Sequence, residues 1–131
     1  MIGLDTNVLA RYIMQDDVKQ AKLANKLIES LSEASPGYIS LVSIVELSWV
    51  LASAFELTRT QVVEAFQHLM AVEAFKIERV VVVAGAVRAF REGKADFSDY
   101  LIERSSAHAG CDRTMTFDKE AAKTGGMVLV Q

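Results

Sequence analysis

The sequence predicts an α/β fold in which a parallel sheet is covered by helices on both faces. Short apolar stretches alternate with longer segments whose apolar residues recur at helical spacing. Strands that alternate with helices in this way run parallel, because each helix returns the chain to the same edge of the sheet. The 131 residues are enough to bury a core, and no linker or internal repeat divides them. We therefore expect residues 1–131 to form a single domain.

Five short apolar stretches are predicted to be strands. They are Ile2–Leu4, Tyr38–Leu41, Phe75–Ile77, Thr114–Phe117 and Met127–Val130. The first is expected to be buried, because its residues are apolar or small. The turn signal Pro36-Gly37 precedes the second.

Seven segments are predicted to be helices. They are Val8–Ile13, Val18–Glu33, Ile44–Phe55, Thr60–Ala71, Val80–Arg91, Ser98–Ala109 and Lys119–Lys123. The four valines Val80–Val83 favour a strand by their β-branched side chains. The residues after them continue a helical pattern, so we assign the whole segment to a helix. Gly110 is expected to end the sixth helix.

Composition and charge exclude several classes of protein. Hydrophobic residues make up 51% and charged residues 24%, as in globular rather than disordered chains. The net charge of −3 provides no general basic field, so contact with a nucleic acid requires a local patch or a metal ion. The single cysteine, Cys111, excludes an intrachain disulfide and fits a reducing cytoplasm. We expect no signal peptide and no membrane span. His68 and His108 stand alone, so no zinc site is expected.

Acidic residues fall at the corners between predicted strands and helices. Asp5 and Asp118 each end a strand, whereas Glu46, Asp96 and Asp99 lie at the starts of helices. In a parallel sheet the carboxyl ends of all strands lie on one edge, and the following helices start at that edge. The predicted topology therefore permits these five carboxylates to converge.

Each acid also has a purely structural interpretation. Asp5 and Asp118 fit helix N-caps, Ser43 and Glu46 fit a capping box, and Asp96 and Asp99 fit a helix dipole. A cap contributes about 1 kcal/mol. Two carboxylates about 5 Å apart repel by roughly 3 kcal/mol at an effective dielectric near 20. Converging acids would therefore need a cation or protons, and a set of oxygen ligands alone selects Mg²⁺ or Mn²⁺. The spacing of the acids in the sequence is consistent with both helix capping and a metal site.

Four segments together resemble the PIN-domain ribonucleases, and most closely the VapC toxins of toxin–antitoxin pairs. They are LDTNVL, SIVEL, ADFSDYLIERSSAHAG and TFDKEAA, in that order, and the resemblance covers essentially the whole chain. It implies a three-layer α/β/α domain with a central, mainly parallel sheet of about five strands. The departures are Tyr100, where a small residue is usual, and Glu103-Arg104, where apolar or small residues are usual.

The resemblance implies a metal-dependent endoribonuclease. The implied ligands of Mg²⁺ or Mn²⁺ are Asp5, Glu46, Asp96, Asp99 and Asp118, of which all but Asp96 are also expected to be catalytic. Thr6, Asn7 and Thr116 are expected to support them. The implied reaction is hydrolysis of an RNA phosphodiester bond by a metal-activated water.

The implied partners are an RNA substrate, a VapB-like antitoxin and a second copy of the chain. The basic residues nearest to the acids in sequence are Arg11, Lys94, Arg113 and Lys119, and solvated surface charges are an equal alternative for each. The helix that ends at Phe55 is apolar nearly all round, so it either is fully buried or presents a second apolar face. We favour an interface there, with Trp49 as its anchor.

Three other functions compete. A metal-dependent phosphatase would need a second aspartate where Asn7 stands. A catalytically idle PIN scaffold would bind protein or RNA without cleaving it, and the complete acidic set of this chain argues against that function. A dinucleotide-binding domain would need a GxGxxG segment after the first strand, and none is present.

Overall fold

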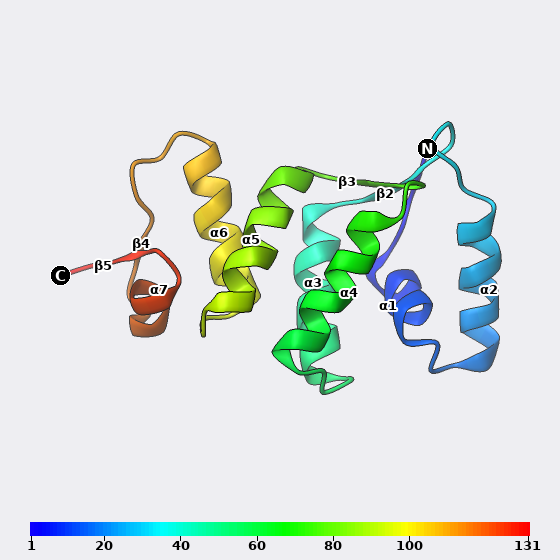
Figure 1. The fold of residues 1–131 in the computed structure, drawn as a ribbon, viewed down its shortest axis with the longest axis horizontal. Helices are drawn as coiled ribbons and strands as arrows, with labels where there is room; N and C mark the ends of the chain where they lie inside the picture. The colour runs from blue at the N-terminus through cyan, green and yellow to red at the C-terminus, as the bar shows by residue number, and fades with distance from the viewer. The chain divides into compact units, whose positions relative to one another are not determined.

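A computed structural model describes residues 1–131 and contains two compact units, Met1–Glu78 and Arg79–Gln131, which we describe separately. The first contains, in order, β1 (Ile2–Gly3), α1 (Thr6–Met14), α2 (Val18–Glu29), β2 (Gly37–Ile39), α3 (Leu41–Ser53), α4 (Arg59–Ala71) and β3 (Phe75–Ile77). The second contains α5 (Val80–Glu92), α6 (Phe97–His108), β4 (Met115–Thr116), α7 (Lys119–Thr124) and β5 (Val128–Leu129) (Figure 1). All five predicted strands and all seven predicted helices are present in the predicted order.

Every pair of neighbouring strands is parallel, as predicted. In the first unit the strand order is β1-β2-β3, with Ile2 opposite Gly37 and Tyr38 opposite Lys76. In the second unit β4 pairs with β5, and Met115 lies opposite Val128. The five strands therefore form a three-stranded and a two-stranded sheet instead of one sheet of about five. Each strand is only two or three residues long, and a helix or its cap begins soon after β1, β2, β3 and β4.

The parallel register places three corners on one edge of the first sheet. Asp5 follows β1, Ser40 follows β2, and Glu78 follows β3. Backbone pairing continues past the strands, since Leu4 N donates to Tyr38 O at 2.9 Å and Glu78 N donates to Ile39 O at 2.9 Å. This edge is therefore where α1 and α3 both start.

The core of the first unit fixes α1 and α3 against each other. Helix α1 packs on α2 and α3, and α4 packs on α3 and β3 (Figure 1). Leu9 of α1 and Ile44 and Leu47 of α3 are fully buried. Burial of each such side chain stabilises the fold by about 1.5 to 3 kcal/mol. The first turns of α1 and α3 are therefore held by packing below them.

The core of the second unit forms along α5 and α6, which lie side by side (Figure 1). The Phe90 ring meets Phe97 and Tyr100 edge to face, with centroids 5.8 and 6.3 Å apart. Val83 and Val87 are buried one turn apart on α5. This packing confirms the helical assignment of the valine run, because burial at helical spacing outweighs β propensity.

The predicted burial of the first strand is wrong. Ile2 is 45% exposed and Gly3 is also exposed. Strand β1 lies at an edge of the three-stranded sheet, and only Leu4, just after it, is buried.

None of the seven helices has both the length and the apolar character needed to cross a bilayer.

Two predicted helix ends are also wrong. Helix α2 ends at Glu29 instead of Glu33, because Ser30 is the C-cap and its hydroxyl donates to Leu27 O. Helix α3 starts at Leu41 rather than Ile44, because the N-cap is Ser40, whose Oγ accepts from Ser43 N at 3.2 Å. The predicted capping box from Ser43 to Glu46 is therefore absent.

Gly85 in α5 and Gly93, the C-cap residue of that helix, provide a paired test of the second unit. A Cβ added at Gly93 would lie 1.6 Å from the hydroxyl of buried Tyr100, so we expect Gly93→Ala to lower the free energy of unfolding by about 2 to 3 kcal/mol. A Cβ at Gly85 would find only ordinary contacts, the nearest at 3.4 Å. Gly85→Ala should therefore raise the free energy of unfolding by about 0.5 to 1 kcal/mol, because alanine favours a helix. Urea unfolding checks both, and equal effects would contradict this packing.

Candidate functional site

The acids of the first unit meet at the start of α1. Asp5 is the N-cap, and its Oδ1 accepts from Thr6 N at 2.9 Å. The buried Thr6 side chain donates from Oγ1 to Glu46 Oε1 at 2.8 Å. Asp5 and Glu46 are both exposed. Two carboxylates from distant parts of the sequence are therefore connected through one buried threonine.

The start of α3 determines where Glu46 points. Because the helix begins at Leu41, Glu46 lies in its second turn and is free of any capping role. Buried Ile44 and Leu47 on either side of it face the core. The carboxylate is thus directed to Thr6, forty residues away in the chain.

The acids of the second unit lie at the starts of α6 and α7. Asp96 is the N-cap of α6, and its backbone N–H donates to Asp99 Oδ2 at 3.2 Å. Asp118 is the N-cap of α7, and its Oδ1 accepts from Glu120 N at 2.8 Å and from Ala121 N at 3.0 Å. The structural interpretation of Asp5 and Asp118 as caps is therefore confirmed, and it leaves their other carboxylate oxygens available. Asp96, expected only to complement a helix dipole, is also an N-cap.

Two carboxylates of the second unit, Asp96 and Asp118, lie close enough to Asp99 to repel its charge. Partial burial raises the pKa of Asp99, and the negative charges of Asp96 and Asp118 raise it further. The hydrogen bond from Asp96 N opposes these effects, but the pKa remains above its ordinary value. The ion pairs of the structure are Arg11–Asp16 and Arg104–Glu103, so no cationic side chain neutralises this group.

The supporting residues have distinct positions. Thr6 holds Glu46, as described above, and Thr116 Oγ1 accepts from Asp118 N at 3.0 Å. Asn7 is exposed in the first turn of α1 and lines a groove between α1 and α2 together with Arg11. Thr6 and Thr116 therefore each fix a candidate ligand, whereas Asn7 contacts none of the five acids through a hydrogen bond.

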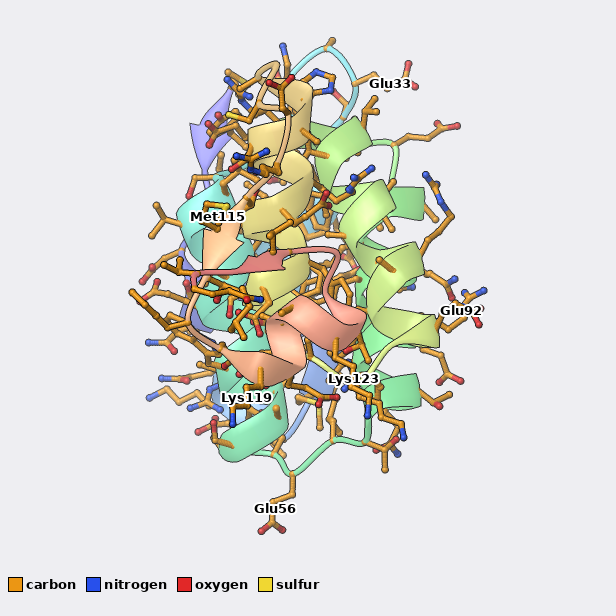
Figure 2. All side chains as sticks on the ribbon, turned by 90° about the vertical axis from the view of Figure 1, so that its left-hand side faces the viewer. Glu33, Glu56, Glu92, Met115, Lys119 and Lys123 are labelled. Carbon is orange, nitrogen blue, oxygen red and sulfur yellow. The ribbon has the colours of Figure 1, made fainter.

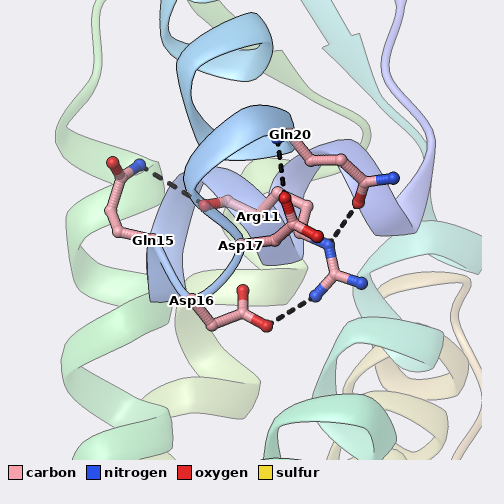
Figure 3. Close-up of polar contacts among 5 residues, drawn as sticks. All are labelled: Arg11, Gln15, Asp16, Asp17 and Gln20. Atoms are coloured by element: carbon pink, nitrogen blue, oxygen red, sulfur yellow. Dashed lines mark hydrogen bonds and ion pairs between the residues drawn. The ribbon is translucent and has the colours of Figure 1, made fainter.

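The four predicted RNA-binding residues differ in whether their side chains already pair with other residues of the protein. Figure 3 shows the Arg11 guanidinium held by Asp16 at 2.7 Å and by Gln20 Oε1 at 2.6 Å. Lys94, Arg113 and Lys119 are exposed and form no ion pair. Figure 2 shows the Lys119 side chain extending outward from α7. These three are free to meet a phosphate, whereas Arg11 would first have to leave its partners.

Sequence reasoning missed two residues at the corners. Glu78 follows β3, and its Oε1 accepts from Leu41 N at 3.0 Å, which ties the start of α3 to the edge of the sheet. Its position after a strand is the same signal that identified Asp5. Phe117, between Thr116 and Asp118, is 83% exposed. A large apolar residue directly before a corner acid could have drawn attention to it.

The donor chemistry of these residues fits a hard divalent cation. All five candidate ligands offer carboxylate oxygens, and no cysteine or histidine is among them. Two of the five belong to the first unit and three to the second. No group of three or more His, Cys, Asp or Glu side chains is arranged around one metal position in the structure. The structure thus shows the two sets of acids separately.

Comparison with known proteins identifies one family. Residues 2–127 match the family model described as PIN domain. This match includes all five acids and both units of the structure. The search of curated proteins found no match.

The raised pKa of Asp99 predicts how the stability of the metal-free protein varies with pH. Below the ordinary value of 3.8 the carboxyl is protonated in the folded and the unfolded chain alike, so burial of the group costs little. As pH rises, the unfolded chain releases this proton first, and the folded protein loses stability until its own raised pKa is passed. We expect Asp99→Asn to gain stability over wild type as pH rises to 7, because asparagine still accepts the Asp96 hydrogen bond without the charge.

Urea unfolding in EDTA between pH 3 and 7 measures this difference. Asp112→Asn, which alters an exposed acid of the same unit, is the control and should show no such trend. A stability gap between Asp99→Asn and wild type that narrows with rising pH would contradict the repulsion described above.

Proposed function

Because the chain belongs to the PIN-domain family, whose fold is that of metal-dependent nucleases, we propose that it is a Mg²⁺- or Mn²⁺-dependent endoribonuclease. We further propose that it is a VapC-type toxin silenced by a VapB-like antitoxin. The observation that best supports a metal-dependent reaction is the group Asp96, Asp99 and Asp118, which has no cationic partner. Partial burial raises the pKa of Asp99, and the charges of Asp96 and Asp118 raise it further. A divalent cation would remove this repulsion.

The proposed ligands are Asp5, Glu46, Asp96, Asp99 and Asp118, and this proposal requires the acids of both units to serve one site. When bound, the ion lowers the pKa of a water molecule and stabilises negative charge on the attacked phosphate. The chain's own residues orient the ligands. Thr6 fixes Glu46, the backbone N–H of Asp96 fixes Asp99, and the first N–H groups of α7 fix Asp118.

Other mechanisms have weaker support from this chain. An aspartyl-phosphate phosphatase needs a carboxylate at Asn7, which carries an amide. A histidine-based ribonuclease needs an imidazole beside the acids. His68 instead stacks near Tyr12, with ring centroids 5.8 Å apart, and His108 lies in the last turn of α6. A catalytically idle scaffold remains the main alternative, and the cleavage assay below separates it from the nuclease.

The outer face of α3 supports the proposal of a protein partner. Full burial of this helix is excluded, since Trp49 is 55% and Val42 is 70% exposed. The buried residues Ile44, Leu47 and Leu51 occupy its opposite side. An apolar side chain as large as Trp49 is a typical interface anchor. We propose that this face contributes to a homodimer or receives the antitoxin.

Loss of single candidate ligands should abolish cleavage of RNA. We expect Asp5→Asn and Asp99→Asn each to lower the rate at least about 100-fold, because each removes a charge needed to hold the ion. The assay incubates the protein with tRNAs and rRNA fragments in Mg²⁺ or Mn²⁺, and EDTA should stop the reaction. Asp112→Asn is the matched control, because Asp112 is exposed, forms no ion pair and is not a candidate ligand.

Two outcomes would contradict the proposal at different levels. Cleavage that persists in EDTA and in Asp99→Asn would reject the metal mechanism. Expression of wild type without an antitoxin should arrest growth, and Asp99→Asn should relieve the arrest. Normal growth with wild type would reject the toxin role and leave the nuclease intact.

A further inference from the structure

The second unit contains a cavity that the proposed metal site does not use. Its volume is about 460 Å³, and it is bounded by α5, α6 and the segment that follows α7. Its lining includes Gly85, Arg88, Tyr100, Glu103, Arg104 and Gly126. We refer to it as the Arg88–Arg104 cavity. The Glu103-Arg104 pair is also where the sequence departs from the PIN-domain pattern.

Two arginine side chains converge on one side of this cavity. A Cβ added at Gly85 would lie 3.4 Å from Arg104 Cδ and 3.9 Å from Arg88 Nη2. Arg88 comes from α5 and Arg104 from α6, so the packing of these two helices brings the side chains over the same glycine. The Arg88 guanidinium therefore lies near the aliphatic part of the Arg104 side chain at this cavity.

Only one of these two charges is neutralised within the protein. Glu103 accepts from Arg104 through both carboxylate oxygens, with 2.7 Å between Arg104 Nη2 and Glu103 Oε1. Arg88 is exposed and forms no ion pair or hydrogen bond. The charges of Arg88, Glu103 and Arg104 therefore sum to +1. The guanidinium group of Arg88 remains available to bind an oxyanion.

The backbone adds a donor at the same cavity. Gly126 has a φ of 74°, a left-handed conformation in which glycine is favoured, and its N–H makes no hydrogen bond in the structure. Phosphate oxygens accept from guanidinium groups and from free peptide N–H groups alike. The Glu103 carboxylate, which pairs with Arg104, also lies beside Gly126, since a Cβ there would be 3.5 Å from Glu103 Cδ. Arg88 and the Gly126 N–H are therefore the donors left for a phosphate group.

We propose that the Arg88–Arg104 cavity binds a phosphate of the RNA backbone that is distinct from the phosphate being cleaved. This proposal rests on the proposed nuclease function. Arg104 lies five residues after Asp99 on α6, about 7.5 Å along the helix axis at 1.5 Å per residue. Because five residues also turn the helix by about 140°, an RNA strand that contacts both Asp99 and this cavity would have to curve around α6. The contact would fix the position of the strand without reading its sequence.

Binding of a short labelled RNA tests the proposal, with Ca²⁺ in place of Mg²⁺ so that affinity is measured without cleavage. We expect Arg88→Gln to weaken binding about fivefold and to lower the slope of log affinity against log salt by about 0.7, the value for one single-stranded phosphate contact. Arg91→Gln removes the same charge from α5 outside the cavity and should change the affinity less than twofold. Glu103→Gln should tighten binding, because it removes a negative charge from the cavity.

Equal weakening by Arg88→Gln and Arg91→Gln would overturn the proposal, since it would indicate a general charge effect. Inorganic phosphate distinguishes the other source of the same chemistry. If phosphate alone shifts the amide resonances of Gly85 and Gly126 but Arg88→Gln leaves RNA affinity unchanged, the cavity takes a free phosphate and the RNA proposal fails. A selective effect of Arg88→Gln in a protein that never cleaves RNA would retain this inference and reject the proposed catalysis.

Discussion

The arrangement of the acids depends on peptide N–H groups and one buried hydroxyl that hold carboxylates where no cationic side chain neutralises them. Asp5, Asp99 and Asp118 each accept from backbone N–H groups at the start of a helix, and Glu46 accepts from Thr6. A helix N-terminus stabilises a nearby negative charge by about 0.3 to 1 kcal/mol. Partial burial of Asp99, together with the charges of Asp96 and Asp118, outweighs this stabilisation and raises the pKa of Asp99. The proposed cation would neutralise these charges.

Apolar packing away from the acids stabilises the helices that carry them. In the first unit, buried Leu9, Ile44 and Leu47 hold α1 against α3, so Thr6 meets Glu46 without help from other charges. In the second unit, the contact of Phe90 with Phe97 and Tyr100 fixes the first turn of α6, next to Asp99. Apolar burial therefore holds the helix starts that carry the acids in both units. The same two helices of the second unit also bring Arg88 and Arg104 together, so an acidic corner and a basic cavity share one framework.

Much of the fold was predictable because its signals are local. The helical pattern of Ala84–Arg91 predicted α5 despite the four consecutive valines before it. Asp5 and Asp118 were recognisable as corner residues, since each directly follows a short apolar run. The start of α3 was less predictable, because Ser40 and Ser43 both fit an N-cap and the choice depends on where β2 ends. The division of the strands into two sheets has no local signal at all.

The contacts that position the acids of the candidate site join residues that are distant in the sequence. The bond from Thr6 to Glu46 spans forty residues, and no spacing rule indicates it. The repulsion of Asp99 by Asp118 likewise depends on how α6 and α7 are placed.

Binding of Mn²⁺, followed by electron paramagnetic resonance, tests the central claim most directly. We predict that wild type binds Mn²⁺ and that Asp5→Asn and Asp99→Asn, one in each unit, both weaken binding at least tenfold. Wild-type affinity in both variants would contradict the claim that these acids serve one metal site.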